Sequence, residues 1–131
     1  MRVVLIAATL ALAACASRGG MPRAPDADLP IPPRWTPYSS EWMRIQTPDG
    51  TAAKYVYFSE SSVDETLEQA RALLVQSGWK QTATEAFVNP EKFPGVWADF
   101  TKGGDRCRVT VIQGTQATHV DYTVARAAPP K

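Results

Sequence analysis

Two turn signals in the last third of the chain predict strand registers that agree with each other. If Gly103 and Gly104 form a two-residue hairpin turn, the apolar side chains before and after them fall on one face, because side chains alternate along a strand. If residues 114–117 form the next loop, a third strand adds its apolar side chains to that face. The face comprises Val96, Ala98, Phe100, Cys107, Val109, Val111, Val120, Tyr122 and Val124. The sequence therefore predicts a three-stranded antiparallel meander with one continuous apolar face.

Residues 63–77 have the pattern of an amphipathic helix that is able to cover this face. Ser62 and Glu65 form a capping box at its start, with Ser62 as the N-cap. Gly78 suits the left-handed position that ends a helix, and Trp79 follows where a Schellman motif places an apolar contact back on the helix. The apolar stripe of the helix consists of Val63, Leu67, Ala70, Leu73 and Leu74.

An N-terminal hairpin is expected from two strands over residues 41–46 and 53–58. Residues 47–50 between them contain the turn sequence Pro-Asp-Gly. With a three-residue loop, one face of this hairpin carries Met43, Ile45, Tyr55 and Tyr57, and the other carries Trp42, Val56 and Phe58. The predicted fold class is α+β: the two N-terminal strands and the C-terminal meander form an antiparallel sheet, and one amphipathic helix packs on one face.

The predicted domain spans residues 38–126 and is followed by a short tail over residues 127–131. Residues 15–37 are rich in proline, which removes backbone donors and favours an extended chain. This segment is interpreted as a tether that holds the domain up to about 60 Å from its point of attachment.

The first residues have the order of a lipoprotein signal peptide. Arg2 is followed by an apolar run over residues 3–14, well short of the roughly 20 residues that span a bilayer. The run ends in Leu12-Ala13-Ala14-Cys15, which resembles the lipobox of bacterial lipoproteins. The resemblance implies that residues 1–14 are removed and that the sulfur of Cys15 receives a diacylglyceryl group. An ordinary signal peptide with Cys15 merely after the cut, or a buried helix, are the alternatives.

The same resemblance implies a location and a first partner. The protein would be held at the bacterial cell membrane by acylated Cys15, with the lipid bilayer as partner. In many Gram-negative lipoproteins an aspartate after the lipidated cysteine retains the protein at the inner membrane. The residue here is Ala16, which implies the periplasmic face of the outer membrane if the source is Gram-negative.

The charge balance argues against nucleic acid as a partner. The chain has 14 lysines and arginines and 13 aspartates and glutamates, and loss of Arg2 with the signal peptide would make these numbers equal. A neutral domain lacks the basic surface that phosphate backbones require.

The predicted register also separates the two cysteines and defines a second sheet face. With Cys15 used for lipid, Cys107 has no partner for an internal disulfide and is expected on the core face as an inert thiol. Asp99 lies across from Arg108 on the opposite face. The candidate binding residues on that face are Trp97, Arg108, Ile112, His119 and Asp121. A solvated face with ordinary salt bridges is the alternative interpretation.

Three functions follow from these features. The first is a non-enzymatic binding or scaffolding domain in the cell envelope that meets another envelope protein through this face or through the aromatic stretch over residues 35–43. The second is a small envelope enzyme with Asp99, His119 and Asp121 as acid/base groups. The third is a binder of a lipophilic ligand between helix and sheet. The chain has one histidine and none of the common nucleophile, zinc or nucleotide motifs, so neither a metal nor a cofactor is expected.

The order of elements adds a looser resemblance. A hairpin, a helix ending in Ser-Gly-Trp and a three-stranded meander are similar to the helix-grip type of α+β module found in a lipoprotein of the outer-membrane barrel-assembly machinery. No functional residue is transferred from that resemblance.

Overall fold

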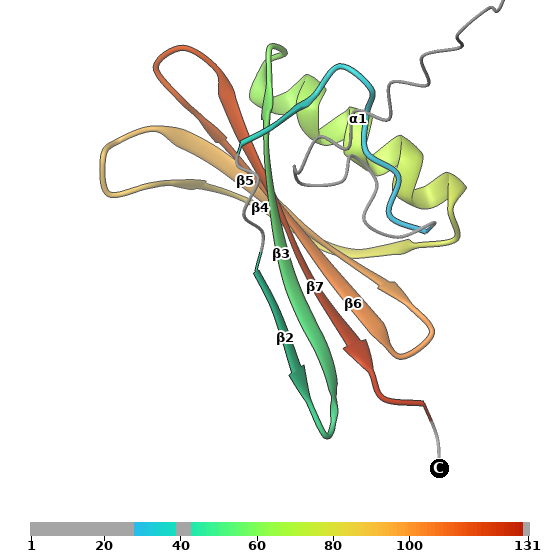
Figure 1. The fold of residues 1–131 in the computed structure, drawn as a ribbon. Coiled ribbons are helices and arrows are strands. Elements are labelled where there is room, and N and C mark those ends of the chain that lie inside the picture. Colours follow the sequence, from blue (N-terminus) through green and yellow to red (C-terminus); the bar gives the residue numbers. More distant parts are fainter. Residues whose placement is uncertain (1–27, 39–42, 130–131) are drawn as a thin grey trace, which may run out of the picture.

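The computed structural model describes residues 28–38 and 43–129 as one antiparallel sheet with a single helix (Figure 1). The fold class is therefore α+β, as predicted. The sheet contains seven strands: β1 Thr36–Pro37, β2 Met43–Thr47, β3 Gly50–Ser59, β4 Lys80–Val88, β5 Pro94–Lys102, β6 Asp105–Gln113 and β7 Thr118–Ala127. The helix, α1, spans Val63–Gln76.

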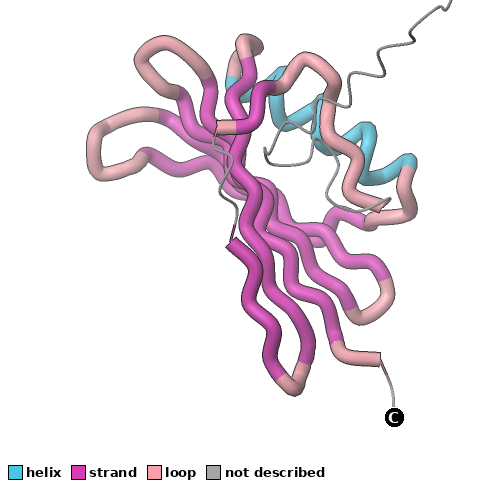
Figure 2. The backbone as a smooth tube through the Cα atoms, viewed as in Figure 1, coloured by secondary structure: helices cyan, strands magenta, loops and turns pink. Residues whose placement is uncertain are grey.

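Among the described residues, a helix covers one face of the sheet and none covers the other. The strand order is β1-β3-β7-β6-β5-β4, and β2 pairs with the free half of β3. The helix α1 packs against β4, β5, β6 and β7 on one side of the twisted sheet (Figure 2). The two faces of the sheet therefore have different surroundings: one is covered by α1 and the other is not.

The predicted meander is confirmed residue by residue. In the β5–β6 hairpin Phe100 pairs with Cys107, and in the β6–β7 hairpin Cys107 pairs with Val124. The predicted apolar face is the sheet side of the core, where Ala98, Phe100, Val109, Val111, Val120 and Tyr122 are fully buried.

The predicted helix and both of its ends are also confirmed. The hydroxyl of Ser62 accepts a hydrogen bond from the backbone N–H of Glu65 at 3.2 Å. At the other end Gly78 has a φ of +92°, and the N–H of Trp79 donates to the carbonyl of Leu74 at 3.0 Å. This bond belongs to the predicted Schellman motif, and the side chain of Trp79 that follows the turn is 2% exposed.

The strand β4 was not predicted. Its residues before Phe87 and Val88 are polar or small, and most of the strand is exposed, so it lacks the apolar alternation that marks a half-buried strand. Pairing with β5 fixes the strand instead, and the hydroxyls of Thr82 and Thr84 donate to β5 carbonyls.

The predicted faces of the N-terminal hairpin are wrong because its loop has two residues, not three. Thr47 pairs with Gly50, Ile45 with Ala52 and Met43 with Lys54. This register turns Met43 and Ile45 away from the buried Tyr55 and Tyr57, and leaves them 60% and 51% exposed. Trp42 lies outside the described residues.

The predicted boundary between tether and domain is also wrong. Residues 28–37 are part of the core: Leu29 is fully buried, and Trp35 is 2% exposed. The Trp35 ring lies 6.1 Å from the rings of both Tyr57 and Tyr122, and its Nε1 donates to Gln69 on the helix. This segment thus covers β3 and β7 beside α1, so residues 28–37 belong to the folded domain and not to the predicted tether.

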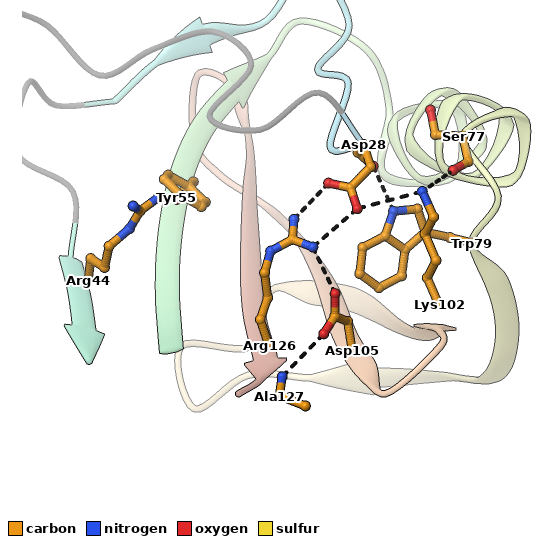
Figure 3. A network of polar contacts seen from close by, with 9 residues as sticks. All are labelled: Asp28, Arg44, Tyr55, Ser77, Trp79, Lys102, Asp105, Arg126 and Ala127. Carbon is orange, nitrogen blue, oxygen red and sulfur yellow. Dashed lines mark hydrogen bonds and ion pairs between the residues drawn. The ribbon is translucent and has the colours of Figure 1, made fainter. Parts of the chain in front are cut away.

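Asp28 fastens the start of this segment to the sheet (Figure 3). Arg126 donates to both of its carboxylate oxygens, at 2.7 and 3.1 Å, and the Lys102 ammonium lies 3.6 Å away. Arg126 also binds Asp105 at 2.9 Å, and the indole of Trp79 donates to the Asp28 carbonyl at 2.6 Å. The hydrogen bonds from Arg126 hold the pKa of Asp28 below its usual value.

We expect Asp28→Asn to lower the free energy of unfolding by about 1–2 kcal/mol, because a charge-assisted pair about a quarter exposed is lost. Because the folded pKa of Asp28 is lowered, the stabilisation exists above its unfolded pKa and disappears as the pH falls through the folded pKa. Urea unfolding at neutral and acid pH measures both effects. Glu68→Gln, which removes an exposed pair with Arg71 on the helix, is the control and should change stability by less than about 0.5 kcal/mol.

Candidate functional site

The sheet face turned away from α1 carries all five residues predicted to bind a partner. This face is called the open face below, and it includes Lys54, Val56, Phe58, Trp97, Asp99, Arg108, Thr110, Ile112, His119, Asp121 and Thr123. Cross-strand pairing places them in rows: Trp97, Thr110 and Asp121 form one row, and Asp99, Arg108 and Thr123 form the next. The predicted residues are thus brought to one surface.

Arg108 contacts both Trp97 and Asp99 on this face. The Arg108 guanidinium donates to both Asp99 oxygens at 2.7 and 2.9 Å, and its central carbon lies 4.1 Å from the centre of the Trp97 ring. The hydrogen bonds from Arg108 lower the pKa of Asp99. Asp99 is therefore a structural anion that orients Arg108 over Trp97.

His119 and Ile112 lie in the row nearest the β6–β7 loop. The His119 ring meets the Phe58 ring edge-on at 4.7 Å, and Phe58 meets Tyr38 in the same way at 4.9 Å. A side chain at Gly114 would lie 2.9 Å from the His119 ring, so the absence of one allows that ring to pack on the loop. His119 is therefore oriented by ring packing.

Asp121 lies at a hollow of about 390 Å³ in the open face. The hollow is bounded by β3, β6 and β7 and by the β4–β5 loop, with Val56, Phe93 and Ile112 among its apolar lining residues. The carboxylate of Asp121 has Lys54 as an ion-pair partner at 3.9 Å, which is longer than a hydrogen bond. Burial raises the pKa of Asp121 above its usual value.

The geometry does not assemble the predicted acid/base group. Asp99 is held by Arg108 in a neighbouring row, whereas His119 and Asp121 lie two residues apart on β7. In the part of the chain that the structure describes, no three His, Cys, Asp or Glu side chains are grouped as metal ligands require.

Cys107 is on the core face of β6, as predicted from the register. Its side chain is 1% exposed, and burial raises the pKa of its thiol to about 12. The thiol is therefore protonated and shielded at neutral pH.

Side chains fill the middle of the space between helix and sheet, whereas a hollow of about 660 Å³ lies at the N-terminal end of α1, lined by Val63 and Asp64, by Ala86 and Val96 of the sheet and by the β6–β7 loop. Leu67, Ala70 and Leu74 of α1 are at most 5% exposed against a sheet face that is itself fully buried. Apart from that hollow, the packed core leaves the open face as the surface on which a ligand can meet this domain.

Sequence reasoning missed two contributors to the hollow. Lys54 was assigned to a strand without a role, and the β4–β5 loop was missed together with β4. In that loop the side chain of Asn89 accepts from the N–H of Phe93 at 2.8 Å. In the sequence, Asn-Pro followed by Phe-Pro is a local turn signal that indicates such a loop. In the structure, Lys92 of this loop has a φ of 71°.

No protein-family model, curated protein or solved structure matches the chain at a significant level. Within residues 28–38 and 43–129, the helix is too short to cross a membrane.

Proposed function

We propose that the chain is a lipoprotein of the bacterial cell envelope that presents its open face as a non-enzymatic binding surface. The observation that carries the proposal is the asymmetry of the sheet. One face is filled by α1 and by residues 28–37, whereas the described residues place no such element over the other. That second face holds an indole, a guanidinium and a hollow with a carboxylate.

The anchor in this proposal is Cys15, which lies outside the described residues. Its support is the resemblance of Leu12-Ala13-Ala14-Cys15 to a lipobox. Because Leu29 and Trp35 belong to the core, the proposal leaves residues 16–27 for the tether, and an extended chain of that length at about 3.1 Å per residue would reach roughly 40 Å. The binding surface would therefore work close to the bilayer that holds the lipid.

The arrangement of polar groups favours binding over catalysis. Trp97 and Arg108 are rigidly presented, as is typical of residues that contribute most to protein interfaces. Each oxygen of Asp99, one of the three acid/base candidates, accepts a hydrogen bond from Arg108. The enzyme hypothesis then rests on His119 and Asp121 alone. The lipophilic-ligand hypothesis is confined to the hollow at the N-terminal end of α1, because the middle of the helix–sheet interface is packed.

Site-specific photocrosslinking in intact cells tests the proposed surface. A photoreactive amino acid at Thr110, between Trp97 and Asp121, should give a discrete crosslinked species, because a bound partner covers that position. The same amino acid at exposed Glu68, on the outer side of α1, is the matched control and should give none. Trp97→Ala together with Arg108→Ala should lower the yield at Thr110 at least fivefold, since hot-spot side chains of this kind each contribute about 1–2 kcal/mol or more. Equal yields from both positions would contradict the proposal.

A further inference from the structure

The hollow beside Asp121 has the features of a site for one cationic side chain. Its volume of about 390 Å³ accommodates a single long side chain. Val56 and Ile112 from the sheet and Phe93 from the β4–β5 loop supply apolar surface. Apolar walls around a carboxylate suit a side chain with a long apolar stem and a charged end.

The carboxylate in this hollow has unused hydrogen-bonding capacity. An ionised carboxylate accepts about four hydrogen bonds. Within the described residues, the carboxylate of Asp121 forms a 3.9 Å ion pair with Lys54, whose side chain is half exposed. Burial disfavours the charged form of Asp121. A cation that came closer than Lys54 would offset this effect, because an opposite charge nearby favours the ionised carboxylate.

The local charge balance favours a cation. Two carboxylates, Asp121 and Glu91, line the hollow, against one ammonium from Lys54; the imidazole of His119 is the other ionisable group of the lining. Lys54 is tied to the carboxylate only at long range, so an incoming cation can share Asp121 with it.

The rim of the hollow is held in place before any ligand arrives. In the β4–β5 loop, the N–H of Asn89 donates to the Phe93 carbonyl at 2.9 Å, and the N–H of Lys92 donates to the Asn89 carbonyl at 2.9 Å. Together with the Asn89 side chain, these bonds close the loop around Glu91. A preformed rim lowers the entropic cost of binding.

In the neighbouring row, an arginine of the chain itself binds a carboxylate and an aromatic ring of this surface. Arg108 bonds both oxygens of Asp99 and stacks on Trp97. Asp121 is a second carboxylate of the same face, with an aromatic wall at Phe93, but without such an arginine from the described chain. We propose that the hollow between Asp121 and the β4–β5 loop binds an arginine side chain of a partner protein, with the guanidinium on Asp121 and the stem between Val56, Ile112 and Phe93.

This inference deepens the proposed binding function and rests on it, but it is tested separately on the purified full chain in detergent. The probe is a capped pentapeptide, Gly-Gly-Arg-Gly-Gly, titrated while the backbone amide resonances are followed by NMR. The expected result is saturable shifts at the amides of Lys54, Phe93 and Asp121. A peptide with citrulline in place of arginine has nearly the same shape without the charge, and should bind at least tenfold more weakly.

The variants locate the effect. Asp121→Asn keeps the side-chain shape and should weaken arginine binding about tenfold, whereas Glu91→Gln at the exposed rim should weaken it about twofold. Asp49→Asn, an equal charge change at the distant β2–β3 turn, should leave binding unchanged. Undisturbed spectra of the free variants show that each is folded.

Three results would overturn the site: no shift at the three amides up to about 10 mM peptide, equal binding of the citrulline peptide, or unchanged binding by Asp121→Asn. Each leaves the crosslinking test at Thr110 untouched. Conversely, arginine binding without any crosslink at Thr110 would contradict the proposed function and not the site.

Discussion

Cys15→Ser is expected to abolish incorporation of labelled palmitate and to move the protein from the membrane fraction to the soluble fraction. The serine hydroxyl is not the thiol that accepts the diacylglyceryl group in the lipobox family. Without acyl chains, whose burial contributes about 0.8 kcal/mol per CH₂, little holds a neutral domain to a bilayer. Palmitate labelling followed by fractionation of cell membranes measures both losses.

The structure and stability of the folded domain should be unchanged in the Cys15→Ser variant. Cys15 lies outside the described residues, and among those that are described the contacts nearest to it in sequence are those of Asp28 and Leu29. Cys107→Ser is the matched control, because Cys107 is buried in the sheet and should leave labelling intact while lowering stability. Continued labelling of the Cys15→Ser protein would show that the lipid is attached elsewhere.

Trp35→Ala should lower the free energy of unfolding by about 3–5 kcal/mol, the usual loss when a buried tryptophan is truncated. The indole fills the space over Tyr57 and Tyr122, and its Nε1 hydrogen bond to Gln69 ties residues 28–37 to α1. Urea unfolding followed by circular dichroism measures the loss.

Tyr38→Ala supplies the comparison three residues away. Tyr38 is 60% exposed and contacts Phe58 on the open face, so its removal should cost about 1 kcal/mol or less. If Trp35→Ala were as mild as Tyr38→Ala, residues 28–37 would be a tether after all, as the proline content suggests.

The meander was predictable because its side chains alternate between two environments. Val96, Ala98 and Phe100 each have an apolar partner across the Gly103-Gly104 turn, so only one register keeps the apolar side chains together. The helix was predictable for a related reason: its capping box and its terminal Gly-Trp are local chemistry that acts without the rest of the fold.

The parts that were missed depend on tertiary contacts. Prolines mask the burial of Leu29 and Trp35, since the same composition serves a free tether and a segment packed on aromatic rings. The strand β4 is an edge strand that stays mostly exposed, and before Phe87 and Val88 its residues show no apolar alternation that predicts a strand. For the N-terminal hairpin, one residue of loop length decided which face Met43 and Ile45 occupy.

The sequence predicts which residues of the candidate site share a face of the sheet, but not the hollow that some of them line. Alternation placed Trp97, Arg108 and Asp121 together, and the pair Asp99–Arg108 was anticipated from its register. The hollow beside Asp121 was not anticipated, because the β4–β5 loop that bounds it follows an unpredicted strand.

The mass of the mature protein tests the central claim most directly. Intact-mass and fragment spectra of the protein extracted from membranes should show a chain that starts at Cys15 and carries the added mass of a diacylglyceryl group on that residue. A chain that retains residues 1–14, or one that starts elsewhere without lipid, would contradict the account of an anchored binding domain.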